Sequence, residues 1–367
     1  MITMIIDSLT IKNFRSFDSY STKFNPQLNI IVAPNGAGKS NLLEAIGLIG
    51  TGSSVRTSKS REAILWGEHV ARVEVLLETA TKLAVSITAS KKHFFVGGSE
   101  TNFRDFMPHV SVVYFQPHDL RLVSGGPHNR RLFLDRTLST INSTYLLVRG
   151  EYLKLLTQRN ALLKSGRYDE MLFTVIEDPL VERAIDMIIA RNNLVSRMNT
   201  ALLPQEIVLE YLPSPQAMRE LLQESAGKGE ENLRTTLREY LREKFRELRE
   251  KEATLGFSLI GPQRDDVKVL IIDPLAPDGL KDILTFGSRG QQRVAVIRLL
   301  FTTADIIEQS RGERPILLLD DVFSELDARN RELILHTITK QQTFITAPDE
   351  SEISMLDFSD ASRISIG

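Results

Sequence analysis

The chain has 367 residues, of which 42 % are hydrophobic and 25 % charged, with a formal net charge of −2. This length and composition are typical of one large or two ordinary soluble domains, and the near-neutral charge means that any basic surface must be local. The absence of cysteine excludes disulfides, thiolate metal sites and cysteine nucleophiles, and it fits a reducing cytoplasm.

The first part of the chain, to about residue 98, has the pattern of half-buried strands. The N-terminal stretch MITMIIDSLTIKNF lacks the basic start of a signal peptide, so we interpret it as a strand. Apolar residues alternate with polar ones over 71–77 and 83–87, and 28–32 is a short buried run. The period of two predicts strands that are antiparallel. No run approaches the length needed to span a membrane.

Residues 33–40 read APNGAGKS and lie between the buried run and a helix that starts at Gly38. Glycines let the backbone approach a phosphate, and the N–H groups of a helix start hold it. We expect Lys39 to reach the β- and γ-phosphates of ATP and Ser40 to place its hydroxyl on Mg²⁺. The standard pattern opens with glycine, where this chain has Ala33. The string therefore predicts an imperfect P-loop, with a chance match as the alternative.

Basic residues are concentrated in two places. Residues 121–167 carry nine Lys or Arg and two Asp or Glu, a local charge of +7, and a second basic loop contains Arg56, Lys59 and Arg61. Phosphate contacts give affinity for DNA without sequence information. The alternative for any single arginine is a surface ion pair. No aromatic ladder accompanies these residues, so duplex backbone binding is favoured over stacking on single strands.

Between about 127 and 255 the apolar spacing of three and four predicts helices over 145–163, 180–202 and 233–248. On the last of these, arginines recur every four residues and are opposed by glutamates. We interpret it as a solvated helix stiffened by i,i+3 and i,i+4 pairs, and a DNA-tracking arm is the alternative. From about 257, strands and helices alternate again. The pattern indicates an α/β domain that is split by a helical insertion.

Residues 286–293 read FGSRGQQR and lead into a helical run. A serine, a glycine and a helix start form a second phosphate-binding surface. One chain has no evident use for two such surfaces, but two chains facing head to tail would each cover the nucleotide of the other. Taken alone, the string also fits a capped helix start.

Residues 316–327 read ILLLDDVFSELD. Four aliphatic residues followed by an acid place Asp320 at the carboxyl end of a buried strand, where it is expected to hold Mg²⁺ through water. Asp321 is the candidate to orient or deprotonate the attacking water. A strand that ends in a polar turn is the alternative if the P-loop is disregarded.

Together these three motifs resemble the ATPase head shared by ABC proteins and SMC-type DNA repair proteins, and within that group the RecF family of bacterial recombination mediators. The resemblance extends over nearly the whole chain. Its specific strings are the Arg-Thr pair at 56–57, RR-x-FLD at 130–135 and GP-x-RDD at 261–266. The chain departs from the family pattern at Ala33, at Gln263, where histidine is common, and over 173–187.

The resemblance implies an α/β fold, a P-loop ABC/SMC-type ATPase head with an antiparallel β subdomain and an inserted helical arm domain. We expect residues 1–120 to form the N-terminal part of the head, with the P-loop and the β subdomain. Residues 121–256 would form the arm. Residues 257–367 would complete the head with the signature, the Walker B strand and the D-loop.

The resemblance also implies the nucleotide contacts. Arg15 would join the P-loop around ATP, and Ser288, Gly290 and Gln291 would contact the nucleotide bound by the opposite subunit. Ser324 to Asp327 would lie at the dimer seam. The P-loop contacts would be made by Ala33, Pro34, Asn35, Gly36, Ala37, Gly38, Lys39 and Ser40.

For the metal and the reaction, the resemblance implies that Gln116 joins Ser40 and Asp320 around Mg²⁺, although a Gln before a proline is by itself typical of a loop. Asp321 and Lys39 would be the catalytic residues. Asp321 stands where transporters have Glu, so we expect a slow, DNA-stimulated ATPase suited to a switch. Thr346 occupies the place where transporters have a histidine.

The family's partners are implied in the same way. The chain would form an ATP-dependent homodimer on duplex or gapped DNA, without sequence preference, and help RecO and RecR to load RecA in the cytoplasm. The basic cluster coincides with this resemblance, which favours DNA over isolated ion pairs. The DNA contacts would be Arg56, Lys59, Arg130, Arg131, Lys154 and Arg159.

Other functions fit the sequence less well. A transporter ATPase keeps its signature much closer to the P-loop and has the switch histidine that is missing here. An SMC-like structural head needs long coiled coils, but heptads are not sustained beyond 233–248. An appended nuclease would need a second acidic cluster, which the sequence lacks.

Overall fold

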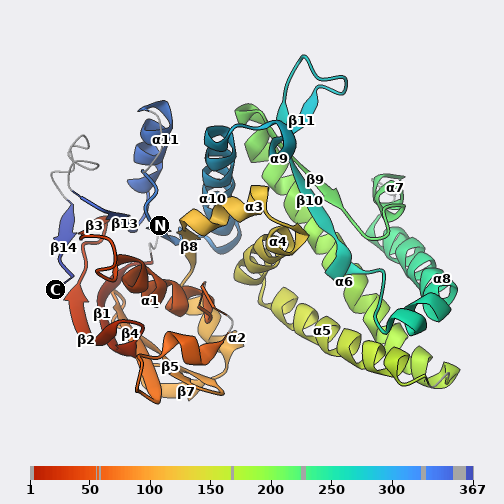
Figure 1. The fold of residues 1–367 in the computed structure, drawn as a ribbon, viewed down its shortest axis with the longest axis horizontal. Helices are drawn as coiled ribbons and strands as arrows, with labels where there is room; N and C mark the ends of the chain where they lie inside the picture. Colours follow the sequence, from red (N-terminus) through yellow and green to blue (C-terminus); the bar gives the residue numbers. More distant parts are fainter. Residues whose placement is uncertain are drawn as a thin grey trace. The chain divides into compact units, whose positions relative to one another are not determined.

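The computed structural model describes residues 4–54, 56–57, 59–166, 169–224, 229–323, 328–349 and 361–366. The chain divides into two compact units (Figure 1). The first, the head, combines Met1–Leu120 with Arg289–Gly367, and the second, the inserted unit, is Arg121–Ser288. None of the described helices is long and apolar enough to cross a membrane.

The head contains an antiparallel sheet of six strands in the order β2-β1-β4-β5-β6-β7. Inward residues of β1, β4 and β5 are buried at alternate positions, as the period of two in the sequence predicts. The antiparallel pairing expected for 71–77 and 83–87 is confirmed. The strands are β1 (Ile6–Phe14), β2 (Phe17–Lys23), β4 (Val70–Leu77), β5 (Lys82–Thr88), β6 (Lys92–Val96) and β7 (Ser99–Thr101).

A second sheet of the head has five strands in the order β14-β3-β13-β12-β8, and every neighbouring pair is parallel. Its central strands β12 and β13 are buried at every position, as expected for parallel strands that are covered on both faces. Parallel strands end at the same edge, so the residues that follow β3, β8 and β12 are brought together. The strands are β3 (Leu28–Val32), β8 (Val112–Phe115), β12 (Ile316–Leu319), β13 (Thr343–Ala347) and β14 (Ser362–Ile364).

Helix α1 (Lys39–Thr51) contacts strands of both sheets, and its residues from Leu42 to Gly50 are buried. The side chains of α1 join those of the two sheets in one hydrophobic core. Close contact with β8 requires a glycine, because a Cβ on Gly50 would lie 2.2 Å from Cγ2 of Val112. The head also contains α2 (Phe103–Phe106), α10 (Arg289–Arg311) and α11 (Ala328–Ile338).

The inserted unit is built on three long helices, which cover the ranges predicted from the apolar spacing. Helix α6 packs against both α5 and α8, and it continues through Pro179. Charged residues of α8 pair with α6, as for Arg238 and Glu182 at 2.5 Å, so part of the predicted solvated face joins the two helices. The helices are α3 (Arg121–Ser124), α4 (Pro127–Ile141), α5 (Ser143–Lys164), α6 (Glu170–Leu202), α7 (Met218–Glu224), α8 (Glu230–Leu255) and α9 (Ile283–Phe286).

The inserted unit also has an antiparallel sheet in the order β11-β10-β9, from β9 (Ile207–Leu212), β10 (Asp266–Ile272) and β11 (Leu280–Asp282). The expected boundary at 256/257 therefore differs from the structure, in which the unit extends to Ser288. The reason is that β10 pairs with β9 along its length, from Asp266 opposite Leu212 to Ile271 opposite Ile207. Pairing between distant segments leaves no signal in the local spacing.

Candidate nucleotide-binding site

The P-loop runs from the end of β3 into α1 and has the backbone that its glycines allow. Gly36 and Gly38 have φ values of 87° and 101°, a region that other residues rarely adopt. A Cβ on Gly38 would lie 3.2 Å from Oγ of Ser16, because the turn between β1 and β2 packs against the loop. No acidic residue occupies the first turn of α1. The helix start is therefore suited to an anion.

Ala33, the departure from the P-loop pattern, lies at the buried base of the loop. It is not among the non-glycine residues with positive φ in the described chain, so its methyl group causes no backbone strain. Pro34 and Asn35 are exposed at the mouth, and Ala37 donates its N–H to the carbonyl of Pro34 at 3.2 Å. The loop conformation is compatible with alanine at this position.

Lys39 is buried at the start of α1. Its Nζ donates hydrogen bonds to the carbonyl of Ala33 and, at 3.1 Å, to that of Pro34. The ammonium group is thus held inside the loop by groups that phosphate oxygens can replace. Ser40 follows it in the first turn of the helix.

The two acids of the Asp-Asp box follow β12. Asp320 is buried, and its Oδ1 accepts a hydrogen bond from the hydroxyl of Thr346 at 2.7 Å. Asp321 has a φ of 51°, in the left-handed region, and its N–H donates to the same hydroxyl at 2.9 Å. Thr346 comes from β13, the strand beside β12. The residues Ser324 to Asp327, expected at a dimer seam, lie outside the described residues.

Gln116 follows β8, the strand on the other side of β12. The register pairs Phe115 with Leu319, so Gln116 and Asp320 end neighbouring strands. Gln116 is buried, unlike the exposed loop glutamine that the following proline suggests, and its N–H donates to Asp119 at 2.8 Å. Two of the three residues predicted for the metal, Gln116 and Asp320, therefore lie at the same edge of the sheet.

Arg15 lies beside α1, where it forms an ion pair of 2.6 Å with Glu44, a residue with no exposed surface. It also has a positive φ of 54°. Arg56 donates to Asn41 at 2.9 Å, and Asn41 in turn donates to Ser16 at 2.9 Å. The predicted nucleotide residue Arg15 and the predicted DNA residue Arg56 therefore both lie around the first turns of α1.

The signature residues are exposed at the start of α10. Ser288, Gly290 and Gln291 are all exposed residues, so a second molecule can reach them. One turn further, Arg293 donates to the carbonyls of Asp321 at 2.8 Å and of Val322 at 3.2 Å. Helix α10 is thereby fixed to the Asp-Asp box of its own chain.

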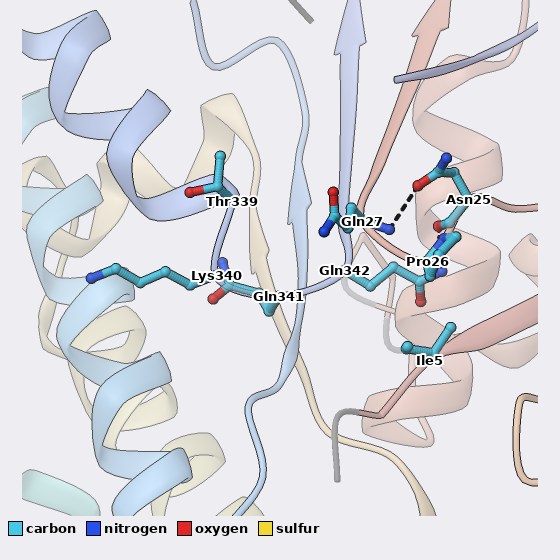
Figure 2. A pocket seen from close by; sticks show the side chains of 8 residues that line it. All are labelled: Ile5, Asn25, Pro26, Gln27, Thr339, Lys340, Gln341 and Gln342. Atoms are coloured by element: carbon cyan, nitrogen blue, oxygen red, sulfur yellow. Dashed lines mark hydrogen bonds between the residues drawn. The ribbon is translucent and has the colours of Figure 1, made fainter. Parts of the chain in front are cut away.

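A cavity of 390 Å³ lies at the opposite end of the parallel strands, before β3 and β13 begin (Figure 2). Gln342 in its wall hydrogen-bonds both backbone groups of Ile6, which is a structural role. Ligands of open parallel sheets bind at the carboxyl ends of the strands, which is where the P-loop lies. The P-loop edge, and not this cavity, is therefore the candidate nucleotide site.

Comparison with known proteins shows similarity over most of the chain. The family model described as RecF/RecN/SMC N terminal domain matches residues 5–357. The DNA replication and repair protein RecF of Halothermothrix orenii is 36 % identical over 94 % of this chain and 92 % of its own length. The protein of the same name from Limosilactobacillus fermentum is 33 % identical over 96 % and 94 %. The chain belongs to the RecF family.

A solved structure of the recombination mediator protein RecF with ATP, in the RecFOR pathway, covers 100 % of this chain and 98 % of its own. It is 29 % identical, with a TM-score of 0.84. The predicted fold class, an ABC/SMC-type ATPase head, is confirmed.

Two of the strings that carry the RecF resemblance, RR-x-FLD and GP-x-RDD, meet inside the inserted unit. Arg130 forms hydrogen bonds of 2.7 and 3.0 Å with the carboxylate of Asp266, and Arg131 donates to the carbonyl of Asp265 at 2.6 Å. Burial, with the nearby charge of Arg191, lowers the pKa of the Arg131 guanidinium. Arg130 was predicted to contact DNA, but its side chain is only 10 % exposed and joins α4 to β10, which disfavours that role. Arg131 is partly buried and uses its guanidinium in the same junction.

The centre of this junction is Arg191 of α6, which sequence reasoning missed. Asp135 and Asp265 each lie 2.8 Å from its guanidinium, and the hydroxyls of Tyr145 and Tyr211 donate to these two carboxylates. Burial raises the pKa of the Asp265 carboxyl despite the attraction of Arg191. Two features of the sequence could have indicated this junction. One is a single arginine on an otherwise apolar face of a predicted helix, and the other is the complementary charge of the RR-x-FLD and GP-x-RDD strings.

The burial of Arg159 likewise disfavours the DNA contact predicted for it. Arg159 has no exposed surface and forms ion pairs of 2.8 Å with Glu177 and 2.7 Å with Glu252, which join α5, α6 and α8. Lys154, on the same helix, is exposed. Lys59 is exposed as well and pairs with Glu62 at 3.6 Å. Of the six predicted DNA residues, the exposed ones are Arg56, Lys59 and Lys154.

Proposed function

We propose that this chain is an ATP-dependent DNA-binding protein of recombinational repair. ATP closes a homodimer on duplex or gapped DNA, and slow hydrolysis opens it again. In this role the protein helps RecO and RecR to load RecA. The solved relative described as a recombination mediator in the RecFOR pathway supports the assignment.

One observation carries the proposal. A single edge of the parallel sheet gathers Lys39, Asp320 and Asp321, while Ser288 and Gly290 stay exposed at the start of α10. The first group is equipped to bind a triphosphate and to activate water. The second is a phosphate-binding surface that a facing chain can use. Two copies head to tail would complete two sites.

The residues at this edge fit Mg²⁺. Ser40 offers a hydroxyl, Gln116 an amide oxygen and Asp320 a carboxylate, and Mg²⁺ prefers such oxygen ligands with waters and substrate phosphates completing its shell. When bound, the ion would neutralise charge on the β- and γ-phosphates. Lys39 would bind the same phosphates, and Asp321 would orient the attacking water and take its proton.

For DNA, the buried arginines leave a smaller basic surface than the sequence suggests. The exposed residues Arg56, Lys59 and Lys154 would contact phosphates, which gives affinity without sequence preference. We expect DNA duplexes of different base sequence to bind with equal affinity. We also expect DNA to stimulate ATP hydrolysis.

Sedimentation of the full chain tests the proposal, with and without ATP, Mg²⁺ and a duplex with a single-stranded gap. ATP is expected to convert monomer to dimer. For the three phosphate contacts of Arg56, Lys59 and Lys154, DNA affinity should fall by about 40-fold between about 50 and 200 mM salt. A chain that stays monomeric under every condition would refute the switch, and salt-insensitive binding would exclude the basic surface.

A further inference from the structure

The side chain of Thr346 makes a hydrogen bond to each acid of the Asp-Asp box. Its hydroxyl donates to Oδ1 of Asp320 at 2.7 Å and accepts the N–H of Asp321 at 2.9 Å. A hydroxyl has one proton to donate and two lone pairs, so both bonds form at once. Thr346 is 1 % exposed, which protects these bonds from water.

The place of Thr346 follows from the sheet. The register of β12 and β13 pairs Leu319 with Ile345. The residues that follow these two, Asp320 and Thr346, are therefore neighbours. Both are inside the head unit. A β-branched residue is well suited to the buried end of this strand, because its rotamer is restricted there. The hydroxyl is thereby aimed at the end of β12.

The bond to Asp321 stabilises an unusual backbone. Asp321 has a φ of 51°, where an L-residue other than glycine is disfavoured. Strand β12 ends at Leu319, so the N–H of Asp321 has left the ladder and needs another acceptor. Thr346 supplies that acceptor and so helps to hold the turn that sets the direction of the Asp321 side chain.

The bond to Asp320 fixes the carboxylate. A hydrogen bond to an ionised group is short and directional, and here it occupies one carboxylate oxygen. Because Thr346 holds Oδ1 of Asp320, it also sets the direction in which the second carboxylate oxygen, Oδ2, points. The two acids are thus related to one another through a single side chain.

We propose that Thr346 is a positioning residue that sets the metal-binding acid Asp320 and the hydrolytic acid Asp321 in one arrangement. This inference rests on the proposed function, since it assigns the two acids their roles in ATP hydrolysis. It adds a contribution from β13, whose residue Thr346 holds both acids through its hydroxyl.

The test compares Thr346→Val and Thr346→Ser with the parent. Valine keeps the branched shape and removes both bonds, and serine keeps the hydroxyl. A matched control is Thr343→Val on the same strand, whose buried hydroxyl donates to the carbonyls of Ile338 at 2.9 Å and Gln341 at 3.2 Å. It loses a buried hydroxyl at the other end of β13.

For Thr346→Val we expect ATP turnover to fall by about 10- to 100-fold, the range seen for partners of metal ligands. The Mg²⁺ concentration at which ATP drives half of the chain into dimers should rise by a similar factor. With saturating Mg²⁺ the dimer should still form, so the loss appears in kcat more than in ATP binding. Thr346→Ser should recover most of both quantities.

Melting curves show whether each variant is folded. If Thr346→Val does not fold, Thr346→Ala can replace it. Comparing Thr346→Ala with Thr346→Ser then shows the effect of the hydroxyl on turnover and on the Mg²⁺ requirement. The inference is overturned if Thr346→Val matches Thr343→Val in turnover and in its Mg²⁺ requirement, or if serine does not restore them. A parent chain that neither hydrolyses ATP nor dimerises with it would instead overturn the proposed function, and the inference with it.

Discussion

At the scale of single residues, the head holds its reactive groups by hydrogen bonds that the nucleotide site itself provides. Lys39 binds two carbonyls of its own loop, and Glu44 holds Arg15 beside the same helix. A cation fixed in this way loses little conformational entropy when it binds a phosphate. This arrangement makes the P-loop a site that is formed before its ligand arrives.

Lys39→Met should therefore weaken ATP binding. Removing one partner of a buried charge pair costs about 2–5 kcal/mol, so we expect affinity for ATP to fall at least 30-fold (roughly 2 kcal/mol), with loss of the ATP-dependent dimer. Calorimetric titration with ATP measures the effect. Lys340→Met is the control, because Lys340 is exposed at the other end of the sheet. Dimerisation of Lys39→Met at the parent's ATP concentration would contradict the proposed role.

Arg159 and Lys154 lie on one helix and should behave in opposite ways. Arg159→Ala leaves Glu177 and Glu252 without their shared cation, and breaking a buried pair costs about 3–5 kcal/mol of the free energy of unfolding. Lys154→Ala changes an exposed residue and should stay within about 0.5 kcal/mol. Urea unfolding followed by circular dichroism separates the two. Equal stabilities would mean that the buried cluster does not act as described.

At the scale of elements, α1 is the part of the head with the least room for change. Its residues from Leu42 to Gly50 are buried, and its first residues belong to the proposed nucleotide site. Helix α5 of the inserted unit, by contrast, is exposed along one side. The same substitution should therefore have opposite effects in the two helices.

Gly50→Ala should destabilise the chain by about 1–3 kcal/mol, because the new Cβ would lie 2.2 Å from Cγ2 and 2.6 Å from Cβ of Val112. Gly150→Ala meets nothing within 4 Å and should stabilise α5 by about 0.5–1 kcal/mol. Thermal melting curves of the two variants and the parent measure these changes in stability. A stable Gly50→Ala protein would show that α1 can move away from β8.

At the scale of the whole molecule, DNA binding depends on exposed charge more than on the number of basic residues. The segment 121–167 has a charge of +7 in sequence, but two of its arginines are buried in ion pairs. Lys59 and Lys154 are exposed on different units. Each can be removed without disturbing the nucleotide site.

Lys59→Ala and Lys154→Ala should each weaken DNA binding uniformly across sequences. Each is expected to reduce the slope of log K against log salt by about 1, because one phosphate contact is lost. Fluorescence anisotropy with labelled duplexes at several salt concentrations measures the slope. An unchanged slope for both variants would place the DNA elsewhere on the molecule.

The sequence by itself determined the elements whose signal is local. The spacing of APNGAGKS placed Lys39 at a helix start, four aliphatic residues placed Asp320 at a strand end, and the period of two identified β1, β4 and β5. These features depend on a few consecutive residues, so a single sequence contains them. The likeness to the RecF family also rested on such short strings.

Only the tertiary structure decided which distant residues meet. It showed that β10 pairs with β9 and so belongs to the inserted unit, that the buried arginines Arg130 and Arg159 are held in ion pairs, and that Thr346 bonds both acids of the box. Charge counting could not distinguish a buried arginine from an exposed one, because burial depends on partners remote in sequence. The physical reason is that buried ions must be paired, and the sequence does not show with what.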